Sequence, residues 1–251
     1  MHTLLLRLVG PMQSWGTQSR FSVRDTQLEP SKSGVIGLLC AAQEQPRDNL
    51  NHIQELARYL WMGVRIDCEG RKEYDYHTAR NILSSDETTS QRSVVGNRYY
   101  LADACFLVGL GSDNLTLLQD LDRALADPAW PLFLGRKSFV PSAPVRLKDG
   151  LREGIDLLDA LRNYAWLGRA WQKRPERLRF VIEHREGDPT SPDQPITQVN
   201  DQPLSFDILN RHYTPRRVRT IIEPPRKKIF QHFAKVKDVE LETGLEAVIG
   251  G

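Results

Sequence analysis

The chain of 251 residues is long enough for one large domain or for a domain with a smaller companion. Hydrophobic residues make up 40% of it, which is enough for a real core, and the net charge of +2 conceals an uneven distribution. No apolar run approaches the length of a membrane span, and the start lacks a basic segment followed by a cleavable apolar one. The three cysteines lie far apart in apolar surroundings. We therefore expect reduced thiols, a cytoplasmic location and no membrane partner.

The first 42 residues predict a buried strand followed by a buried helix. An apolar run over residues 4–9 ends at a Gly-Pro pair, which is typical of a buried strand. Ser31 is a suitable N-cap, and residues 35–42 are apolar on almost every side, which predicts a buried helix. The first turn would present unpaired N–H groups together with Lys32-Ser33-Gly34, so it is a candidate phosphate seat. The alternative is a plain helix start with a solvated lysine.

Further along, the pattern predicts a second helix and two extended segments. Asn51 is a candidate cap for a helix over residues 52–59, which have apolar side chains at helical spacing. Residues 61–68 alternate and predict a strand, and residues 72–78 alternate aromatic and polar side chains. The next residues, up to 97, are rich in serine and threonine, and extended segments flank them. This stretch is a candidate projecting hairpin, along which Arg80, Arg92 and Arg98 are spaced.

Residues 99–110 are the clearest strand signal in the chain. Asn114 is then a good cap for a helix that ends at Asp127-Pro128. A proline-rich loop over residues 130–144 carries Gly135-Arg136-Lys137-Ser138, two adjacent cations and a hydroxyl that suit phosphate or base contact. A solvated loop is the alternative. Helices packed on one side of a mostly antiparallel sheet would make an α+β domain.

The carboxyl-terminal part predicts a helix over residues 157–171, strands at 179–184 and 218–222, and a final tail. Nine Lys or Arg stand against one acid between Arg211 and Lys237, and six against one between Arg162 and Arg179. Blocks of this size favour a polyanionic partner, and an exposed basic face without such a partner is the alternative.

Several motifs carry a resemblance to a known family. The segment Gly10-Pro11-Met12-Gln13-Ser14-Trp15-Gly16, paired with Lys32-Ser33-Gly34-x-x-Gly37-Leu38-Leu39, resembles the amino-terminal half of CRISPR-associated RAMP proteins. Within them it is similar to the CasD family, which caps the 5′ handle of the guide RNA in type I-E Cascade complexes. The match continues through residues 76–78, 98–104 and 133–138, and so covers roughly the first 150 residues.

The resemblance implies a ferredoxin-like (RRM-related) RAMP domain over residues 1–144, with a thumb hairpin at about residues 79–97. For residues 145–251 we expect a smaller, β-rich, basic subdomain and a tail. The implied function is a non-catalytic subunit that binds CRISPR RNA, with the CasC backbone and the large subunit CasA as neighbours. The basic carboxyl-terminal half could face RNA, displaced target DNA or CasA, and the sequence leaves these open.

Candidate RNA-binding residues follow from these motifs. Tyr99 and Tyr100 point to opposite faces of a strand, so we expect one in the core and only one to stack on a base. Trp15 is better explained as a core anchor than as a contact residue. The full set is Gln13, Trp15, Lys32, Ser33, Gly34, His77, Arg80, Arg92, Arg98, Tyr99, Tyr100, Arg136, Lys137 and Ser138.

The alternative function is a metal-independent endoribonuclease that processes CRISPR repeat RNA. His77 would be its general acid or base, and Lys137 would stabilise the scissile phosphate. The adjacent lysine and histidine of the processing relatives are absent, since Ser138 follows Lys137. A small-ligand enzyme is a third option, but Asn114 replaces the last glycine of a dinucleotide loop that would start at Gly109. The histidines show no metal-ligand spacing, so we expect no catalytic residue, metal or cofactor.

Overall fold

The computed structural model describes residues 1–17, 23–82, 92–188, 192–207 and 209–230. The tail expected after residue 230 and the tip of the expected hairpin, residues 83–91, lie outside these ranges. The described helices are α1 (Lys32–Ala42), α2 (Leu50–Tyr59), α3 (Leu115–Ala126), α4 (Leu157–Asn163) and the 3-10 helix η1 (Lys227–Phe230). Among these described helices, none is long and apolar enough to cross a membrane.

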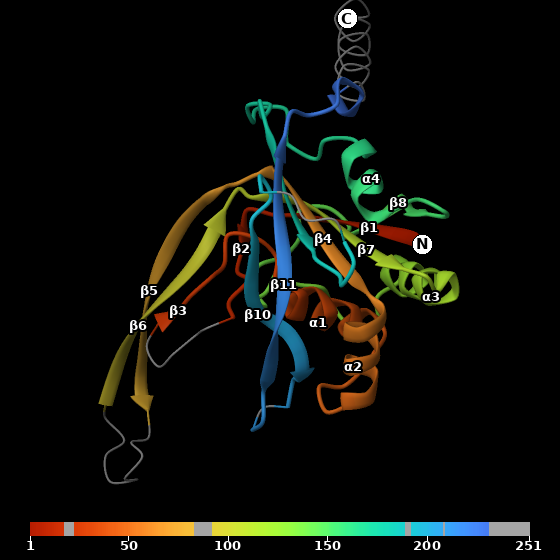
Figure 1. The fold of residues 1–251 in the computed structure, drawn as a ribbon. Coiled ribbons are helices and arrows are strands. Elements are labelled where there is room, and N and C mark those ends of the chain that lie inside the picture. Colours follow the sequence, from red (N-terminus) through yellow and green to blue (C-terminus); the bar gives the residue numbers. More distant parts are fainter. Residues whose placement is uncertain (18–22, 83–91, 189–191, 208, 231–251) are drawn as a thin grey trace, which may run out of the picture.

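Two sheets organise the fold (Figure 1). The larger has seven strands in the order β10-β11-β9-β4-β7-β1-β8, and each neighbouring pair is antiparallel. Its strands are β1 (His2–Val9), β4 (Trp61–Cys68), β7 (Cys105–Ser112), β8 (Arg146–Arg152), β9 (Leu178–Glu183), β10 (Ile196–Ser205) and β11 (His212–Glu223). The smaller sheet contains β2 (Met12–Gln13), β3 (Val23–Arg24), β5 (Arg71–Ile82) and β6 (Arg92–Ala102). The mixed α/β fold with a large antiparallel sheet is thus confirmed.

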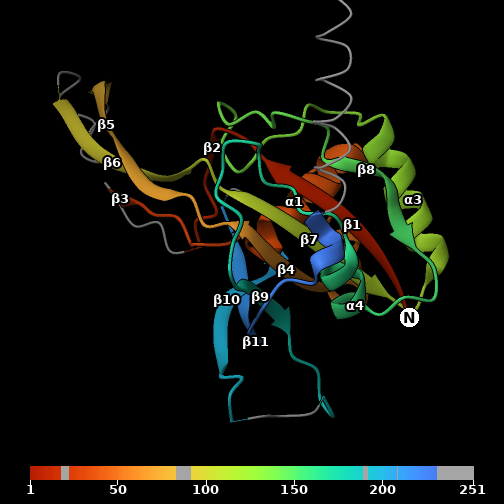
Figure 2. The same ribbon diagram turned by 90° about the horizontal axis from the view of Figure 1, so that it is seen from above.

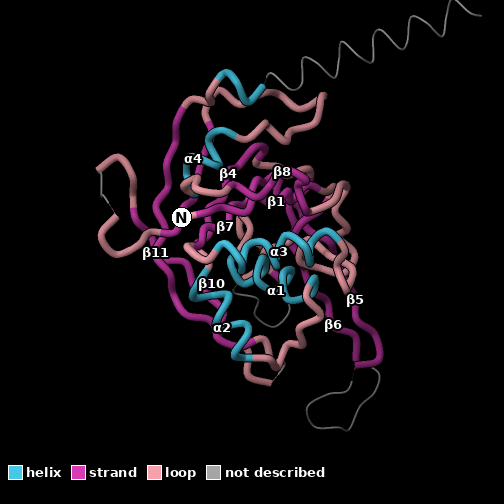
Figure 3. Tube along the Cα trace, turned by 90° about the vertical axis from the view of Figure 1, so that its right-hand side faces the viewer, coloured by secondary structure: helices cyan, strands magenta, loops and turns pink. Residues whose placement is uncertain are grey.

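Helices cover both faces of the large sheet, so the expectation that they pack on one side was wrong. Leu4 and Leu6 belong to a core that includes buried residues of α1, α2 and α3, whereas Leu5 belongs to a second core with Leu157 and Leu161 of α4. Successive side chains of a strand point to opposite faces, so the apolar run of β1 serves both cores. Figure 3 shows the strands β1, β4 and β7 between α4 and the other three helices. The buried first strand and the buried first helix are therefore confirmed.

The third helix begins at its predicted cap, and the second helix does not. The Asn114 side chain accepts a hydrogen bond from the Leu117 N–H, as expected for an N-cap. Helix α2 is capped by Asn49 rather than Asn51, so the prediction placed its start two residues too late. Asn49 and Asn51 are both suitable N-caps just before the apolar positions of α2, and the sequence gives no reason to choose between them.

Two predictions of regular structure were wrong. The strand expected over residues 99–110 is divided between β6 and β7, which belong to different sheets. Asp103, with φ of 58°, turns the chain between them, and its N–H donates to the Pro11 carbonyl at 3.0 Å. The helix expected over residues 157–171 ends at Asn163. The next two carbonyls, of Tyr164 and Ala165, instead accept hydrogen bonds from the buried side chain of Arg65.

Strands β5 and β6 form a long antiparallel hairpin, from the pair Arg71–Ala102 to the pair Ile82–Arg92. The hairpin projects away from the large sheet, as Figures 1 and 2 show. Strands β8 to β11, from the carboxyl-terminal part of the chain, join the same large sheet as β1, β4 and β7. The expected division into two domains at residue 144 stays a prediction.

Candidate nucleic-acid interface at the base of the hairpin

Three arginines meet where β3, β6 and the loop over residues 130–144 come together. Arg24 of β3 lies opposite Arg98 in the parallel pairing of β3 with β6. The guanidinium of Arg136 donates to the Tyr99 carbonyl at 2.7 Å and lies 3.4 Å from the Arg24 carbonyl. Arg24 and Arg98 are exposed, and Arg136 is half-buried. These three residues form what we call the arginine cluster.

The electrostatics of the arginine cluster favour an anionic ligand. The pKa of Arg136 is lowered, first by burial and then by the charges of Arg98 and Arg24, while Asp75 opposes the shift. Like charges held this close repel one another, and a phosphate between them would remove the repulsion. A guanidinium offers a planar fork of N–H donors that matches phosphate oxygens.

The loop that carries Arg136 is fixed by its backbone. Gly135 has φ of +99°, and a Cβ at this position would lie 1.8 Å from the Ser14 carbonyl oxygen. Only glycine fits such a close approach. Leu134 and Phe139 close the loop through a 2.8 Å hydrogen bond from the Leu134 N–H to the Phe139 carbonyl. The next residues of the loop, Lys137 and Ser138, are exposed beside this anchored arginine.

The other face of the hairpin base carries an aromatic pair, because Tyr99 follows Arg98 in β6 and successive side chains of a strand point to opposite faces. Tyr99 of β6 pairs with Tyr74 of β5, and their ring centroids are 5.8 Å apart. Tyr74 is 59% exposed, and the ammonium of Lys72 lies 4.9 Å from the centre of the Tyr99 ring. Lys72 also pairs with Asp25 at 2.8 Å. Burial would raise the pKa of Asp25, but the hydrogen bonds from Lys72 and the Thr26 N–H outweigh it and lower that pKa.

The two adjacent tyrosines separate as predicted. Tyr100 packs against the core of α1, α2 and α3, with its ring 5.9 Å from that of Phe139. Tyr99 faces the opposite side of the strand, toward Tyr74 and Lys72. Of the two half-buried tyrosines, Tyr99 is therefore the one whose ring lies away from the core.

The outer part of the hairpin carries further predicted residues. His77 and Arg80 are exposed on β5. Arg92 lies at the start of β6, and its side chain falls outside the described residues. Arg136, rather than Lys137, is the loop cation that reaches the hairpin base. Gly109, the start of the suspected dinucleotide loop, lies inside β7 and its Cβ position is filled by Leu157.

The phosphate seat expected at the start of α1 is corrected to an internal ion pair. Lys32 is 1% exposed, and its ammonium donates to Glu183 at 3.0 Å and to the Ala57 carbonyl at 2.9 Å. The backbone N–H of Lys32 donates to the carboxylate of Asp201 at 2.7 Å. Burial lowers the pKa of Lys32, and the charge of Glu183 opposes this shift. Protein carboxylates thus occupy the place foreseen for a phosphate.

Four more predicted residues are packed inside the protein. Gln13 is fully buried and donates to the carbonyls of Leu8 and Ala104. Trp15 is 1% exposed and donates from its indole to Gln13, which agrees with its expected role as a core anchor. Gly34 lies against the Trp15 ring, and Ser33 is buried beside Ser31. Gln13, Trp15 and Ser33 are therefore buried, and Gly34 is half-buried against the Trp15 ring.

The sequence alone did not single out Arg24, Lys72 and Tyr74. Lys72 and Tyr74 lie in the stretch over residues 72–78, whose alternation of aromatic and polar side chains predicts a strand with one exposed face. Arg24 had none, because it reaches Arg98 through a pairing between segments more than 70 residues apart.

Comparisons with known proteins point to one family. Residues 3–219 match the family described as CRISPR-associated protein (Cas_Cas5). The "CRISPR system Cascade subunit CasD" of Escherichia coli (strain K12) is 33% identical over 179 residues, covering 66% of this chain and 78% of that protein.

Two solved structures are similar along nearly the whole chain. A "Crystal structure of Cas protein" has a TM-score of 0.66 and 39% identity, covering 90% of this chain and 99% of the other. A chain of a "CRISPR RNA-guided surveillance complex" has a TM-score of 0.70 and 31% identity, covering 91% and 92%. On this evidence the chain belongs to the Cas5 family of CRISPR-associated proteins.

Proposed function

We propose that this chain is a non-catalytic subunit of a type I-E Cascade complex that binds CRISPR RNA and caps its 5′ handle. The observation that carries the proposal is that the hairpin base, in a member of this family, has the arginine cluster on one face and the Tyr74–Tyr99 pair on the other. A strand of RNA that passes around the hairpin base would meet cations for its phosphates and rings for its bases, which is what single-stranded RNA recognition requires.

The hairpin of β5 and β6 would act as the thumb. Its exposed residues project beyond the body of the molecule, where a neighbouring subunit can be reached. We assign that neighbour to the CasC backbone, and place CasA as the second neighbour. A ferredoxin-like (RRM-related) core is supported by the order of elements along the chain, which is β1, α1–α2, β4, β7, α3 and β8. It is also supported by the strand order in the sheet, β4-β7-β1-β8.

The absence of RNA cleavage is part of the proposal. His77 is exposed on the hairpin, and the lysine–histidine neighbours of processing relatives are missing from the sequence. The hairpin base offers cations and rings for binding, while an acid or base for attack by a 2′-hydroxyl needs a histidine held beside the scissile phosphate.

The test uses labelled repeat RNA, with and without its 5′ handle, in buffer containing EDTA. Gel mobility and strand length are followed together, with the chain alone and with the chain purified together with CasC. We expect a shift that needs the handle and leaves the RNA intact. Arg98→Gln should weaken it about tenfold, as loss of a charge-assisted contact to phosphate does, and the exposed control Arg58→Gln on α2 should not.

Two results would overturn the proposal. Cleavage within the repeat would make the chain an endoribonuclease and His77 the first residue to substitute. If the chain, both alone and with CasC, binds RNA equally well with and without the handle, the 5′ handle is not the ligand.

A further inference from the structure

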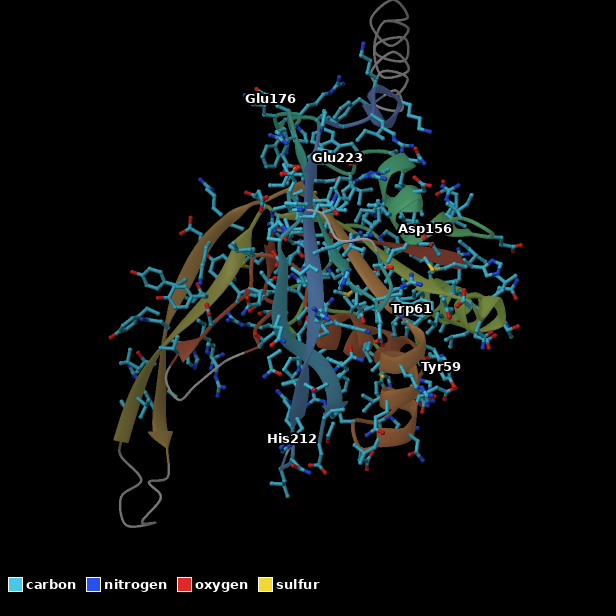
Figure 4. All side chains as sticks on the ribbon, viewed as in Figure 1. Tyr59, Trp61, Asp156, Glu176, His212 and Glu223 are labelled. Carbon is cyan, nitrogen blue, oxygen red and sulfur yellow. The ribbon has the colours of Figure 1, made fainter. Side chains whose placement is uncertain are left out.

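A second basic surface lies at the end of the molecule away from the hairpin tip. It is built from residues 162–177 and 222–230, which pack together: the Trp166 N–H donates to the Ile229 carbonyl at 3.0 Å, and the rings of Trp166 and Phe230 are 5.7 Å apart. Figure 4 labels Glu176 and Glu223 at this end. We call this region the upper basic surface.

The upper basic surface has a large excess of positive charge. Its two segments contain eight Lys or Arg and two acids, Glu176 and Glu223. Both acids are already paired, Glu223 with Arg162 at 2.7 Å and Glu176 with Lys173 at 3.6 Å. Three exposed cations, Arg174, Lys227 and Lys228, form no ion pair with any carboxylate in the described part of the chain. Their charge is therefore available to a partner.

A solvent-exposed tryptophan stands on the same surface. Trp171 is 66% exposed, and the guanidinium of Arg169 lies 5.6 Å from its ring centre. The segment beneath it is held in place, because Arg169 pairs with Asp103 at 3.0 Å and the Gln172 side chain donates to the Asp103 carbonyl at 2.9 Å. A large ring that lies mostly outside the core on an anchored segment contributes little to burial and is suited to contact with a partner.

We propose that the upper basic surface binds a single strand of nucleic acid at a site separate from the arginine cluster. A base stacks on the Trp171 ring, and the phosphates of its neighbours lie against Arg174, Lys227 and Lys228. Free cations beside an exposed ring match a nucleic-acid strand, which supplies both phosphates and flat bases, better than an acidic peptide, which supplies charge alone. The inference concerns different residues from the handle site and does not depend on it.

The experiment measures binding of the full chain to labelled oligothymidylate and oligouridylate, which lack the repeat sequence, over a range of salt concentrations. The triple variant Arg174→Gln, Lys227→Gln, Lys228→Gln should lower the slope of log affinity against log salt by about 2, since each phosphate contact on a single strand contributes roughly 0.7. Trp171→Ala should weaken binding about tenfold, in the range measured for a stacked base. The proposal is supported whichever oligonucleotide binds more tightly. Tighter binding of oligothymidylate would identify the strand as DNA, and tighter binding of oligouridylate would identify it as RNA.

Matched controls separate this site from general charge and from the handle site. The control triple Arg58→Gln, Arg123→Gln, Lys148→Gln removes exposed cations on α2, α3 and β8, and Trp130→Ala removes another exposed tryptophan, 41% exposed. Both control variants should leave oligonucleotide binding within about twofold, as substitutions outside a contact do. Binding of handle RNA should be unchanged in the upper-surface triple variant.

Three outcomes would overturn the proposal. An equal loss in both triple variants would mean attraction by overall charge. A parallel loss of handle binding in the upper-surface triple variant would mean one continuous site. Binding to polyglutamate that is tighter than to either oligonucleotide, and is lost in Trp171→Ala, would make the surface a protein-docking site.

Discussion

The ammonium of Lys32 lies 3.0 Å from the Glu183 carboxylate, buried between the first turn of α1 and the last residue of β9. Lys32 is 1% exposed, and Glu183 also accepts a hydrogen bond from the Met62 N–H at 3.0 Å. Through this pair a residue near the amino terminus is joined to a strand from the carboxyl-terminal part. Lys32, which belongs to the motif Lys32-Ser33-Gly34, therefore joins helix α1 to the large sheet.

Lys32→Met should therefore damage stability rather than RNA binding. Removing the ammonium leaves the Glu183 carboxylate with the more distant Arg216 guanidinium, at 3.8 Å, as its remaining ionic neighbour. The loss should therefore cost about 3 kcal/mol in the free energy of unfolding, at the lower end of the range for breaking a buried pair. Urea denaturation measures this cost, and handle RNA binding is measured under conditions where the variant is folded. The double variant Lys32→Met, Glu183→Gln should recover part of the loss, because no unpaired carboxylate remains.

Lys137→Ala is the matched comparison for Lys32→Met. Lys137 is exposed on the loop of the arginine cluster, so its loss should change stability by less than about 0.5 kcal/mol. Handle RNA binding should weaken. The reverse pattern, with normal stability and lost RNA binding in Lys32→Met, would restore the phosphate seat at α1 and refute the internal role.

The two tyrosines of β6 should give opposite phenotypes. Tyr99→Leu removes a half-buried ring on the face away from the core, so we expect handle RNA binding to weaken about tenfold, as loss of one stacked base does, with a smaller change in stability than Tyr100→Leu. Tyr100→Leu removes a ring that packs on Phe139 and should lower the free energy of unfolding by about 1–3 kcal/mol. RNA titration and urea denaturation of both variants check this. Equal RNA affinities would show that neither ring stacks on a base.

Local signals in the sequence predicted the parts of the fold that local chemistry controls. The Ser31 cap of α1 and the Asn114 cap of α3 each accept the hydrogen bond expected from the following turn. The break at Asp103 had no such signal. The residues on both sides of it are mostly apolar or aromatic and therefore predict one continuous strand, although the two halves belong to different sheets. Strand β10 was missed altogether, since its polar residues become regular only by pairing with β11.

The candidate site divides in the same way. Exposed cations on the loop and hairpin, such as Arg98 and Lys137, are where the motifs suggested. Lys32 and Gln13 are polar residues whose partners, Glu183 and the Leu8 and Ala104 carbonyls, are supplied by tertiary contacts. Such long-range partners decide whether a polar residue faces solvent or the core, and a single sequence does not reveal them.

Arg65 should be irreplaceable even by lysine. It is fully buried, pairs with Asp67 at 2.6 and 2.9 Å, and donates to the carbonyls of Leu161, Tyr164 and Ala165. A lysine ammonium lacks the planar fork that makes these five bonds, so Arg65→Lys should cost about 3 kcal/mol or more in the free energy of unfolding. The exposed change Arg58→Lys should cost less than about 0.5 kcal/mol.

Hydrogen exchange locates the effect of Arg65→Lys. The amides after α4, including that of Leu167, which donates to Asp67 at 2.7 Å, should lose protection first. Uniform loss of protection over the whole chain, with no excess after α4, would contradict a local anchoring role for Arg65.

The Cys40 thiol in α1 should make the protein less stable at alkaline pH. Burial raises the pKa of Cys40 from 9.0 to about 11. Between these values the unfolded chain loses the thiol proton and the folded chain keeps it, so the stabilisation present below pH 9 is lost as pH rises toward 11. The loss over this window amounts to about 2–3 kcal/mol for two pKa units.

Other groups titrate in the same range, and Lys32, whose pKa is lowered by burial, acts in the opposite direction. The measurement is therefore the difference in unfolding free energy between wild type and Cys40→Ala at each pH, in which these other groups cancel. Cys40→Ala should cost a constant amount below pH 9, for the cavity it leaves, and that cost should shrink steadily between pH 9 and 11. Two pH curves that stay parallel up to pH 11 would mean that the thiolate is solvated in the folded protein, and α1 would then be open to solvent on the side where the structure buries it.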